Sequence, residues 1–298
     1  MVRTERGQLL LIGAILIGLT IIGTVVMLNG MQYADAASTQ SENRVLDDAE
    51  RTEEMVERDM GQLVEGVYRS NPVDPGRALD ANVSTYDNYT RNMTASMGDK
   101  TVNTTLNVTA SKGNEISHSS STNFKSDSSA NDWTLVTDTQ KLRQFRMTIE
   151  PHNSGGAFRV VADPATGPAW RMRVDKPTSS QIRIRVNNGT DSESCIGNDP
   201  DVELDLLGGT GTFPSTGTDC PQLPTIQNSV SSPYDIRFEN SQHAEGQYQL
   251  HVTGDVQDSE IPGSTAPAPV IPAIDYRYQN AEFEYNRTIL IEPGEASP

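Results

Sequence analysis

The longest apolar run in the chain, from Leu9 to Leu28, constrains its fold more than any other feature. The run consists of Leu, Ile, Val, Met and Ala and is interrupted only by glycine and threonine. Twenty residues of α-helix span about 30 Å, which is the thickness of the hydrocarbon core of a bilayer. The sequence therefore predicts a transmembrane helix over residues 8–29, with the lipid bilayer as its first partner.

The charges on either side of this run predict its orientation. Arg3 and Arg6 precede it, and acidic residues follow from Asp35 onward. By the positive-inside rule, we expect a cytoplasmic leader over residues 1–7 and an extracellular chain beyond about residue 30. The expected localisation is the cell membrane, with the C-terminal domain outside the cell.

Three interpretations of the apolar run differ in whether, and where, the chain is cleaved. A secretory signal peptide has a shorter apolar core and an Ala-x-Ala cleavage site, and Ala34-Asp35-Ala36 supplies such a site before Ala37. The run is longer than the core of a standard signal peptide, so an uncleaved signal anchor is the second alternative.

The third alternative rests on a resemblance. Arg6-Gly7-Gln8 stands directly before the apolar run, and this junction resembles the leader junction (class III signal peptide) of archaellins and archaeal type IV pilins. The resemblance covers roughly residues 3–30. It implies that a prepilin peptidase cuts between Gly7 and Gln8, that the apolar helix stays on the mature subunit, and that the chain assembles with other pilin-like subunits. Ile12 stands where bacterial-type pilins have a glutamate.

Residues 30–70 are predicted to continue the helix. One apolar stripe on an otherwise charged segment recurs at steps of three or four residues or their multiples, and Asn71-Pro72 ends the segment. The stripe consists of Leu46, Ala49, Val56, Met60, Leu63 and Val67. Such a helix is expected to dock its apolar side on the domain that follows.

The charge balance excludes some partners. The 298 residues include 40 acidic and 23 basic side chains, for a formal net charge of −17. Such a field repels nucleic acid, so no nucleic-acid partner is expected. Few lysines and many acidic residues indicate a haloarchaeal-type protein adapted to high salt, and an acidic secreted protein from ordinary salt is the alternative.

Residues 71–130 are rich in Asn, Ser, Thr and Gly and carry most of the sequons of the chain. These sequons predict a glycosylated surface, and a polar β-hairpin region is the alternative, since 101–109 alternates like a strand. The candidate glycosylation sites of the whole chain are Asn82, Asn88, Asn92, Asn103, Asn107, Asn188 and Asn286.

Residues 131–298 are predicted to form an antiparallel β domain, because short alternating segments are separated by Gly, Pro, Asn and Asp. The expected strands include 133–138, 143–150, 157–163, 169–175, 181–187, 202–207, 234–239 and 247–253. Four of these segments place arginine on the face away from the core, with a bulge expected between the first two arginines. The arginines are Arg143, Arg146, Arg159, Arg171, Arg173, Arg183 and Arg185. This basic stripe either meets an acidic partner surface or pairs with the protein's own carboxylates.

The two cysteines, Cys195 and Cys220, are expected to form one disulfide if the domain lies outside the membrane. No histidine or further cysteine stands at metal-ligand spacing, which disfavours a metal site or a reactive thiol.

No catalytic motif is present, and neither a metal nor a cofactor is expected. Asp199, Asp201, Glu203 and Asp205 alternate as in a calcium loop, but Leu204 replaces the required glycine. The four histidines are scattered, and His251 is expected on the surface of a strand.

These observations predict an α+β fold in which a long N-terminal transmembrane and amphipathic helix precedes an antiparallel, β-rich extracellular domain of pilin-like or β-sandwich form. The expected function is a non-enzymatic structural or accessory subunit of an archaeal type IV pilus-like assembly. The alternative is a monomeric, membrane-anchored binding protein or adhesin.

Overall fold

The computed structural model describes residues 41–70, 74–97, 100–152, 155–281 and 283–292. Contacts divide the chain into two units, Met1–Thr52 and Glu53–Pro298. Of the first unit, residues 41–52 are described and belong to an α-helix; all other described elements belong to the second unit.

The described residues contain two α-helices, α2 (Ser41–Arg69) and α3 (Pro75–Met97). Proline suits the first turn of α3 because its missing N–H has no partner in a helix there. The Oδ1 of Asp74 caps the same turn by accepting from the N–H of Arg77 at 2.9 Å. One side of α3 is buried through Leu79, Val83 and Tyr86, which recur at helical spacing.

All described strands belong to one antiparallel sheet of 13 strands, in the order β13-β12-β1-β11-β2-β10-β3-β4-β5-β6, with β7, β8 and β9 branching from β2. The strands are β1 (Lys100–Asn123), β2 (Trp133–Pro151), β3 (Ala157–Pro164), β4 (Trp170–Thr178), β5 (Gln181–Asn187), β6 (Ser192–Gly197), β7 (Val202–Asp205), β8 (Thr210–Phe213), β9 (Thr218–Asp219), β10 (Tyr234–Glu239), β11 (Ala244–Val256), β12 (Ser264–Asn280) and β13 (Glu284–Leu290). Two short 3-10 helices, Ser241–His243 and Asp258–Glu260, flank β11.

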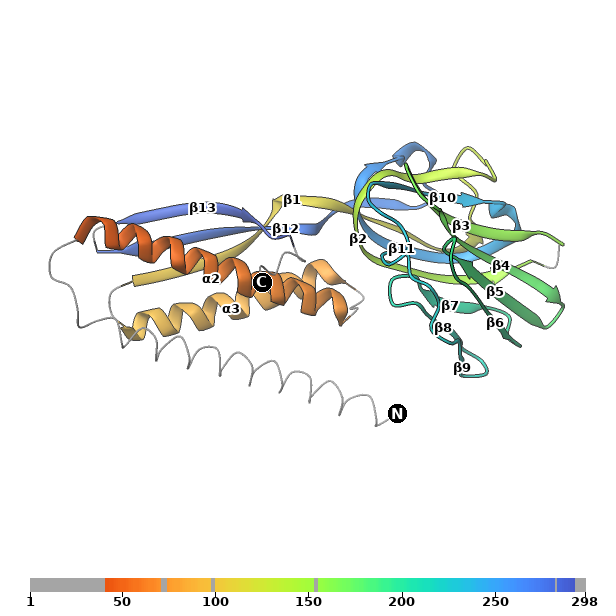
Figure 1. The fold of residues 1–298 in the computed structure, drawn as a ribbon, viewed down its shortest axis with the longest axis horizontal. Coiled ribbons are helices and arrows are strands. Elements are labelled where there is room, and N and C mark those ends of the chain that lie inside the picture. The colour runs from red at the N-terminus through yellow and green to blue at the C-terminus, as the bar shows by residue number, and fades with distance from the viewer. Residues whose placement is uncertain (1–40, 71–73, 98–99, 153–154, 282, 293–298) are drawn as a thin grey trace. The chain divides into compact units, whose positions relative to one another are not determined.

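The long strands β1 and β12 connect two packing environments (Figure 1). Their paired portions Lys100–Asn107 and Ala273–Asn280, together with β13, form a three-stranded segment beside the helices. Val102, Tyr276 and Tyr278 are buried on its inner face, where α3 packs against β1. Beyond the register shifts after Asn107, β1 stays paired with β12 as far as Ser117 and also pairs with β11 on its other side, from Asn114 onward.

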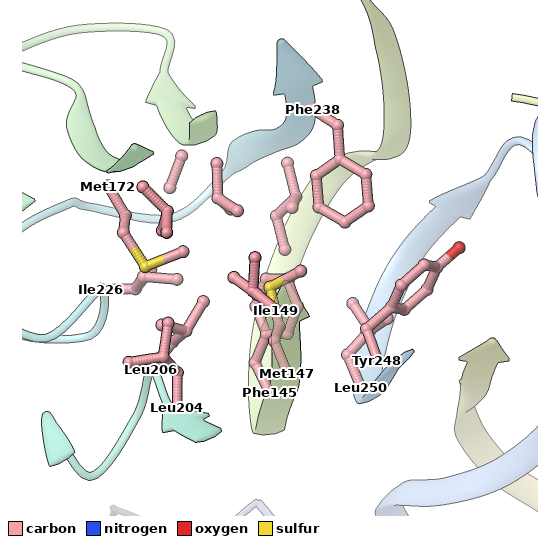
Figure 2. Close-up of a cluster of buried hydrophobic side chains, with 14 of the residues drawn as sticks. Phe145, Met147, Ile149, Met172, Leu204, Leu206, Ile226, Phe238, Tyr248 and Leu250 are labelled. Atoms are coloured by element: carbon pink, nitrogen blue, oxygen red, sulfur yellow. The ribbon is translucent and has the colours of Figure 1, made fainter. Parts of the chain in front are cut away.

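The remaining strands enclose a hydrophobic core (Figure 2). Side chains from β2, β4, β7, β10 and β11 point toward one another there, and Phe145, Phe238 and Leu250 are fully buried. Fully burying side chains of this size contributes about 1.5–3 kcal/mol each. The disulfide between Cys195 and Cys220 ties β6 to the segment after β9.

The structure corrects the expected α+β fold with one long N-terminal helix. Among the described residues, α2 ends at Arg69, and a second helix rather than a polar hairpin follows it. The physical reason is that α3 hides a helical apolar stripe inside a segment of largely polar composition, so Asn, Ser and Thr occupy its solvent side. The described chain is mostly antiparallel sheet.

The expected membrane-spanning helix is corrected as well. Within the described residues, no helix is long and apolar enough to cross a bilayer. Both helices carry charged or polar residues on their exposed sides, which a hydrocarbon core would not accommodate. The segment 8–29 lies outside the described residues, so the structure does not support a single-pass membrane anchor or the localisation inferred from it.

Gly246 in β11 allows a close approach of two strands. Its φ is +144°, and a Cβ there would overlap the carbonyl oxygen of Thr148 on β2. We expect Gly246→Ala to lower the free energy of unfolding by about 2 kcal/mol or more, because both strain and overlap result. Urea denaturation followed by tryptophan fluorescence measures this change.

Gly61 provides the matched control. It lies within α2, and no heavy atom outside its own helix would lie within 4 Å of an added Cβ. Gly61→Ala is expected to raise stability by about 0.5–1 kcal/mol. Equal effects of the two substitutions would show that the close approach at Gly246 is not a constraint.

Candidate interaction surface

A row of arginines crosses three neighbouring strands of the sheet. The antiparallel register places Arg159 on β3 opposite Arg173 on β4, and Arg173 opposite Arg185 on β5. Residues directly opposite each other in a sheet project to the same face. The three guanidinium groups therefore stand side by side on one surface.

The local sequence explains why these side chains point outward. On each strand, apolar residues alternate with the arginines, and Val160, Met172 and Ile184 are fully buried in the core. Because the side-chain period of a strand is two, burying the apolar set forces the arginine set into solvent. The side chains of Arg159 and Arg173 are about two-fifths exposed, at 40% and 41%.

Three more arginines extend this row on the same side of the sheet. Arg171 lies two residues from Arg173 on β4, Arg183 lies two residues from Arg185 on β5, and Arg237 faces outward from β10. We call this set the arginine face; it consists of Arg159, Arg171, Arg173, Arg183, Arg185 and Arg237.

Carboxylates of the same strands neutralise part of the arginine face. Glu239 lies 3.4 Å from Arg159 and 3.3 Å from Arg237. Asp163 lies 3.1 Å from Arg237. These pairs bridge β3 and β10.

Asp175 neutralises a second pair of arginines, Arg173 and Arg183. Its carboxylate accepts hydrogen bonds from Arg183, at 2.5 Å for Nη2, and lies 3.4 Å from Nε of Arg173. The hydrogen bond to Asp175 raises the pKa of the Arg183 guanidinium, which is always charged in any case. Three carboxylates therefore serve four arginines.

Arg171 and Arg185 are exposed and have no ion-pair partner within the part of the chain that the structure describes. Like charges directly opposite each other destabilise a sheet, and exposed ion pairs contribute only about 0–1 kcal/mol each. Arg171 and Arg185 therefore make no evident contribution to the stability of the fold. They present planar guanidinium groups that bind carboxylate, sulfate or phosphate oxygens in a bidentate manner.

Sequence reasoning identified most of this surface and misassigned one member. Arg143 does not face solvent: its side chain is 6% exposed, and it pairs with Glu65 of α2 at 3.2 Å. The cause is a β-bulge, because Leu142 pairs with Val252 and Gln144 pairs with His251, which leaves Arg143 between them without a partner in the register. Arg146 lies opposite Asp205 of β7. Arg237 was missed, although 234–239 shows the same alternation.

The ion pair of Arg143 belongs to a buried polar cluster under the C-terminal end of α2. The guanidinium carbon lies 5.5 Å from the ring centre of Tyr68, and its Nε donates to the carbonyl of Val270 at 3.3 Å. Burial lowers the pKa of Arg143, while Glu65 raises it. The cluster attaches the helix to β2 and β12.

His251 lies in the same cluster rather than on the surface where it was expected. The side chain is 1% exposed, and neither ring nitrogen has a hydrogen-bond partner among the residues that the structure describes. Its Nε2 is 3.6 Å from Glu115, and its ring packs edge-on against Tyr68 at 6.1 Å. Burial lowers the pKa of His251; Glu115 and Asp74 oppose this, and Arg146 adds to it.

Asp199, the first of the alternating acids, accepts hydrogen bonds from a turn rather than forming part of a calcium loop. The Asp199 carboxylate accepts from the N–H of Ser215 at 2.8 Å, its hydroxyl at 2.9 Å and the N–H of Thr216 at 3.1 Å. Burial raises the pKa of Asp199, but these hydrogen bonds outweigh it and the net shift is downward. No group of three or more potential metal ligands is placed to hold an ion within the described residues.

The other predicted site residues are placed as follows. Cys195 and Cys220 form the expected disulfide. Gly7 and Gln8 lie outside the described residues. The candidate sequon asparagines lie on α3 (Asn82, Asn88 and Asn92), on β1 (Asn103 and Asn107), in the turn between β5 and β6 (Asn188) and on β13 (Asn286).

Comparisons with known proteins place few limits on this chain. Residues 3–136 match the model described as "Family of unknown function (DUF7261)". No curated protein matches the chain. A crystal structure of Scytalido-glutamic peptidase with a peptide based transition state analog aligns over 62% of this chain and 88% of that chain, at 10% identity and a TM-score of 0.23. A TM-score this low does not indicate a shared fold.

The buried imidazole predicts a pH dependence of stability. Because the pKa of His251 is lower in the folded state than its ordinary value of about 6.5, the unfolded chain binds more protons below that pH. Stability is therefore full above about pH 6.5 and falls as the pH drops, by up to about 1.4 kcal/mol at pH 5.5 from this residue. His251→Gln removes the titration and is expected to flatten the profile between pH 7.5 and 5.5.

Denaturation at a series of pH values in constant salt provides the measurement. His152, which is partly exposed beside Glu245, supplies the control substitution His152→Gln. Equal flattening in both variants, or none in His251→Gln, would contradict the role given to the buried ring.

Proposed function

We propose that this chain is a non-enzymatic structural or accessory subunit of a pilus-like assembly, and that the arginine face binds an acidic surface of a neighbouring subunit. The observation that carries the proposal is the row Arg159–Arg173–Arg185, with Arg171 beside it, in a protein of net charge −17. Arg159 and Arg173 have carboxylate partners, whereas Arg171 and Arg185 have none among the described residues, so a role outside folding accounts for these two better.

The chemistry of the face favours a polypeptide carboxylate as the contact. In high salt the Debye length falls to about 3 Å at 1 M, so distant charges are screened and only groups in direct contact interact. Guanidinium groups retain directional, bidentate hydrogen bonds to carboxylates under these conditions. A neighbouring chain of similar acidity supplies such carboxylates at high density.

The sequence of the N-terminal region supports assembly with similar subunits. The apolar run from Leu9 to Leu28 needs a large apolar surface to cover it, since exposed apolar patches of that size promote association. The resemblance of Arg6-Gly7-Gln8, followed by this run, to the leader junction of archaellins and archaeal type IV pilins implies the class of assembly.

A monomeric binding protein is the second candidate, because the same arginines also fit a small or polymeric anion. The two functions differ in the molecule that is bound to the arginine face in the cell. In the first it is a carboxylate-bearing protein segment, and in the second it is a ligand without peptide bonds.

Site-specific photo-crosslinking distinguishes these outcomes. A photoreactive residue at position 187, which is exposed next to Arg185 on β5, should form an adduct with an acidic peptide of another pilin-like subunit, identified by mass spectrometry. Arg171→Gln with Arg185→Gln is expected to reduce the adduct at least fivefold, because both free guanidinium groups are removed.

Arg58→Gln with Arg77→Gln is the matched control. These two exposed arginines lie on α2 and α3, and their loss changes the net charge by the same amount. If no peptide adduct forms, or if both double variants reduce it equally, the arginine face is not a subunit contact.

The mature N-terminus tests the class of assembly independently. Edman or mass-spectrometric sequencing of the protein from its own cells is expected to begin at Gln8, because the leader junction implies cleavage after Gly7. A start at Ala37 would instead identify an ordinary secreted protein, and a start at Met1 an unprocessed one.

A further inference from the structure

Two sequons lie on the outer face of the three-stranded segment formed by β1, β12 and β13. The register aligns Asn103, Arg277 and Asn286 in one row across these strands. The next row on the same face contains Thr105, Asp275 and Thr288. Each sequon therefore displays its asparagine and its threonine together, as expected for residues i and i+2 of a strand. This outer face lies opposite the one that α3 covers.

The sequons of α3 have a different geometry. Residues i and i+2 of an α-helix point in directions about 200° apart, so asparagine and hydroxyl cannot face one enzyme together. In addition, the hydroxyls of Thr90 and Thr94 are buried and donate to the carbonyls of Tyr86 and Thr90, both at 2.9 Å. The folded chain thus withholds Asn88 and Asn92 from modification although their amides are exposed.

Asn286 is the most accessible of the strand sequons. It is exposed on β13, which is an edge strand of the sheet (Figure 1). An edge strand is held by one neighbour only and separates from the sheet more readily than a central strand. By contrast, Asn107 is held on both sides of its amide: its Nδ2 donates to Asp275 at 2.9 Å, and its Oδ1 accepts from the N–H of Ala110 at 3.0 Å.

The contacts of Asn286 leave room for a substituent. Its Nδ2 donates one hydrogen bond, to Oε1 of Glu284 at 3.0 Å, and an amide carries a second hydrogen that a sugar replaces. Thr288 donates to Oδ1 of Asp275 at 2.7 Å, which holds the hydroxyl on the asparagine's side of the strand. The pair is therefore presented in an ordered, extended conformation.

An open hollow of about 650 Å³ adjoins this sequon. Its lining is mainly polar and includes Asn103, Thr105, Asp275, Arg277, Asn286 and Thr288. Arg277 and Asp275 offer a donor and an acceptor for saccharide hydroxyls, and Arg277 is itself held by Glu284 at 3.0 Å. A sugar attached at Asn286 would lie over this hollow.

We propose that Asn286 is N-glycosylated and that the first sugars of the glycan rest against the hollow between β1, β12 and β13. The donor is an oligosaccharide esterified to a lipid phosphate. The Nδ2 of Asn286 forms a bond to the anomeric carbon, the bond from that carbon to the phosphate oxygen breaks, and the lipid phosphate leaves with the electron pair. The displaced amide proton passes to a base of the transferase. The disulfide is typical of proteins that mature in an oxidising environment, where such transfer takes place.

This proposal does not depend on the arginine face, which lies on other strands. Tryptic or chymotryptic glycopeptide mapping by mass spectrometry of the full chain, isolated from the cells that make it, measures occupancy at each sequon. We expect occupancy above one half at Asn286, and less than one tenth at each of Asn82, Asn88 and Asn92. Thr288→Val is expected to abolish the modification of Asn286, whereas Thr288→Ser keeps it, because serine also completes a sequon.

Two results of the glycopeptide mapping would overturn the proposal. Occupancy below one half at Asn286 in the unaltered protein overturns the proposal. Occupancy on α3 equal to that on β13 also overturns it, because strand geometry would then not select the site. Retention of the Cys195–Cys220 disulfide in both Thr288 variants, measured by thiol labelling, shows that a lost glycan does not reflect failed folding.

Discussion

The register between β3, β4 and β5 is the constraint on which much of the molecule depends. It buries Val160, Met172 and Ile184 in one core and, by the same alternation, aligns Arg159, Arg173 and Arg185 outside it. A slip of one residue would exchange the two sets, burying three guanidinium groups at a cost of several kcal/mol each. The core therefore fixes the arginine face with no need for contacts among the arginines themselves.

A second constraint joins the helices to the sheet. The bulge at Arg143 turns a strand arginine inward, where it meets Glu65 and Tyr68. The guanidinium is 6% exposed and Glu65 is 46% exposed, so removing Glu65 would leave a buried cation without its carboxylate, whereas removing Arg143 would leave a carboxylate that water still reaches. The pair connects α2 to β2. Burial of His251 beside it favours the neutral ring, and neither ring nitrogen has a hydrogen-bond partner among the described residues.

Sequence patterns predicted the local structure of the sheet better than its tertiary contacts. Strict alternation located β3, β4 and β5 and the outward direction of their arginines. The same rule failed at Arg143, because the bulge expected between Arg143 and Arg146 lies at Arg143 itself. Its position depends on how β2 pairs with β11, more than one hundred residues later. It failed for α3 because Leu79, Val83 and Tyr86 are sparse among polar residues, so composition concealed the helical period. The burial of His251 likewise depends on Tyr68, which is distant in the sequence.

The two surfaces differ in the charge that they present. On the arginine face, planar guanidinium groups project from neighbouring strands that lie about 4.8 Å apart. On the outer face of β12 and β13, the charges of Arg277 and Glu284 already neutralise each other, and neutral polar groups of Asn and Thr dominate. The sheet thereby separates a basic surface from a largely neutral, polar one, and alternation along each strand keeps both outside the core.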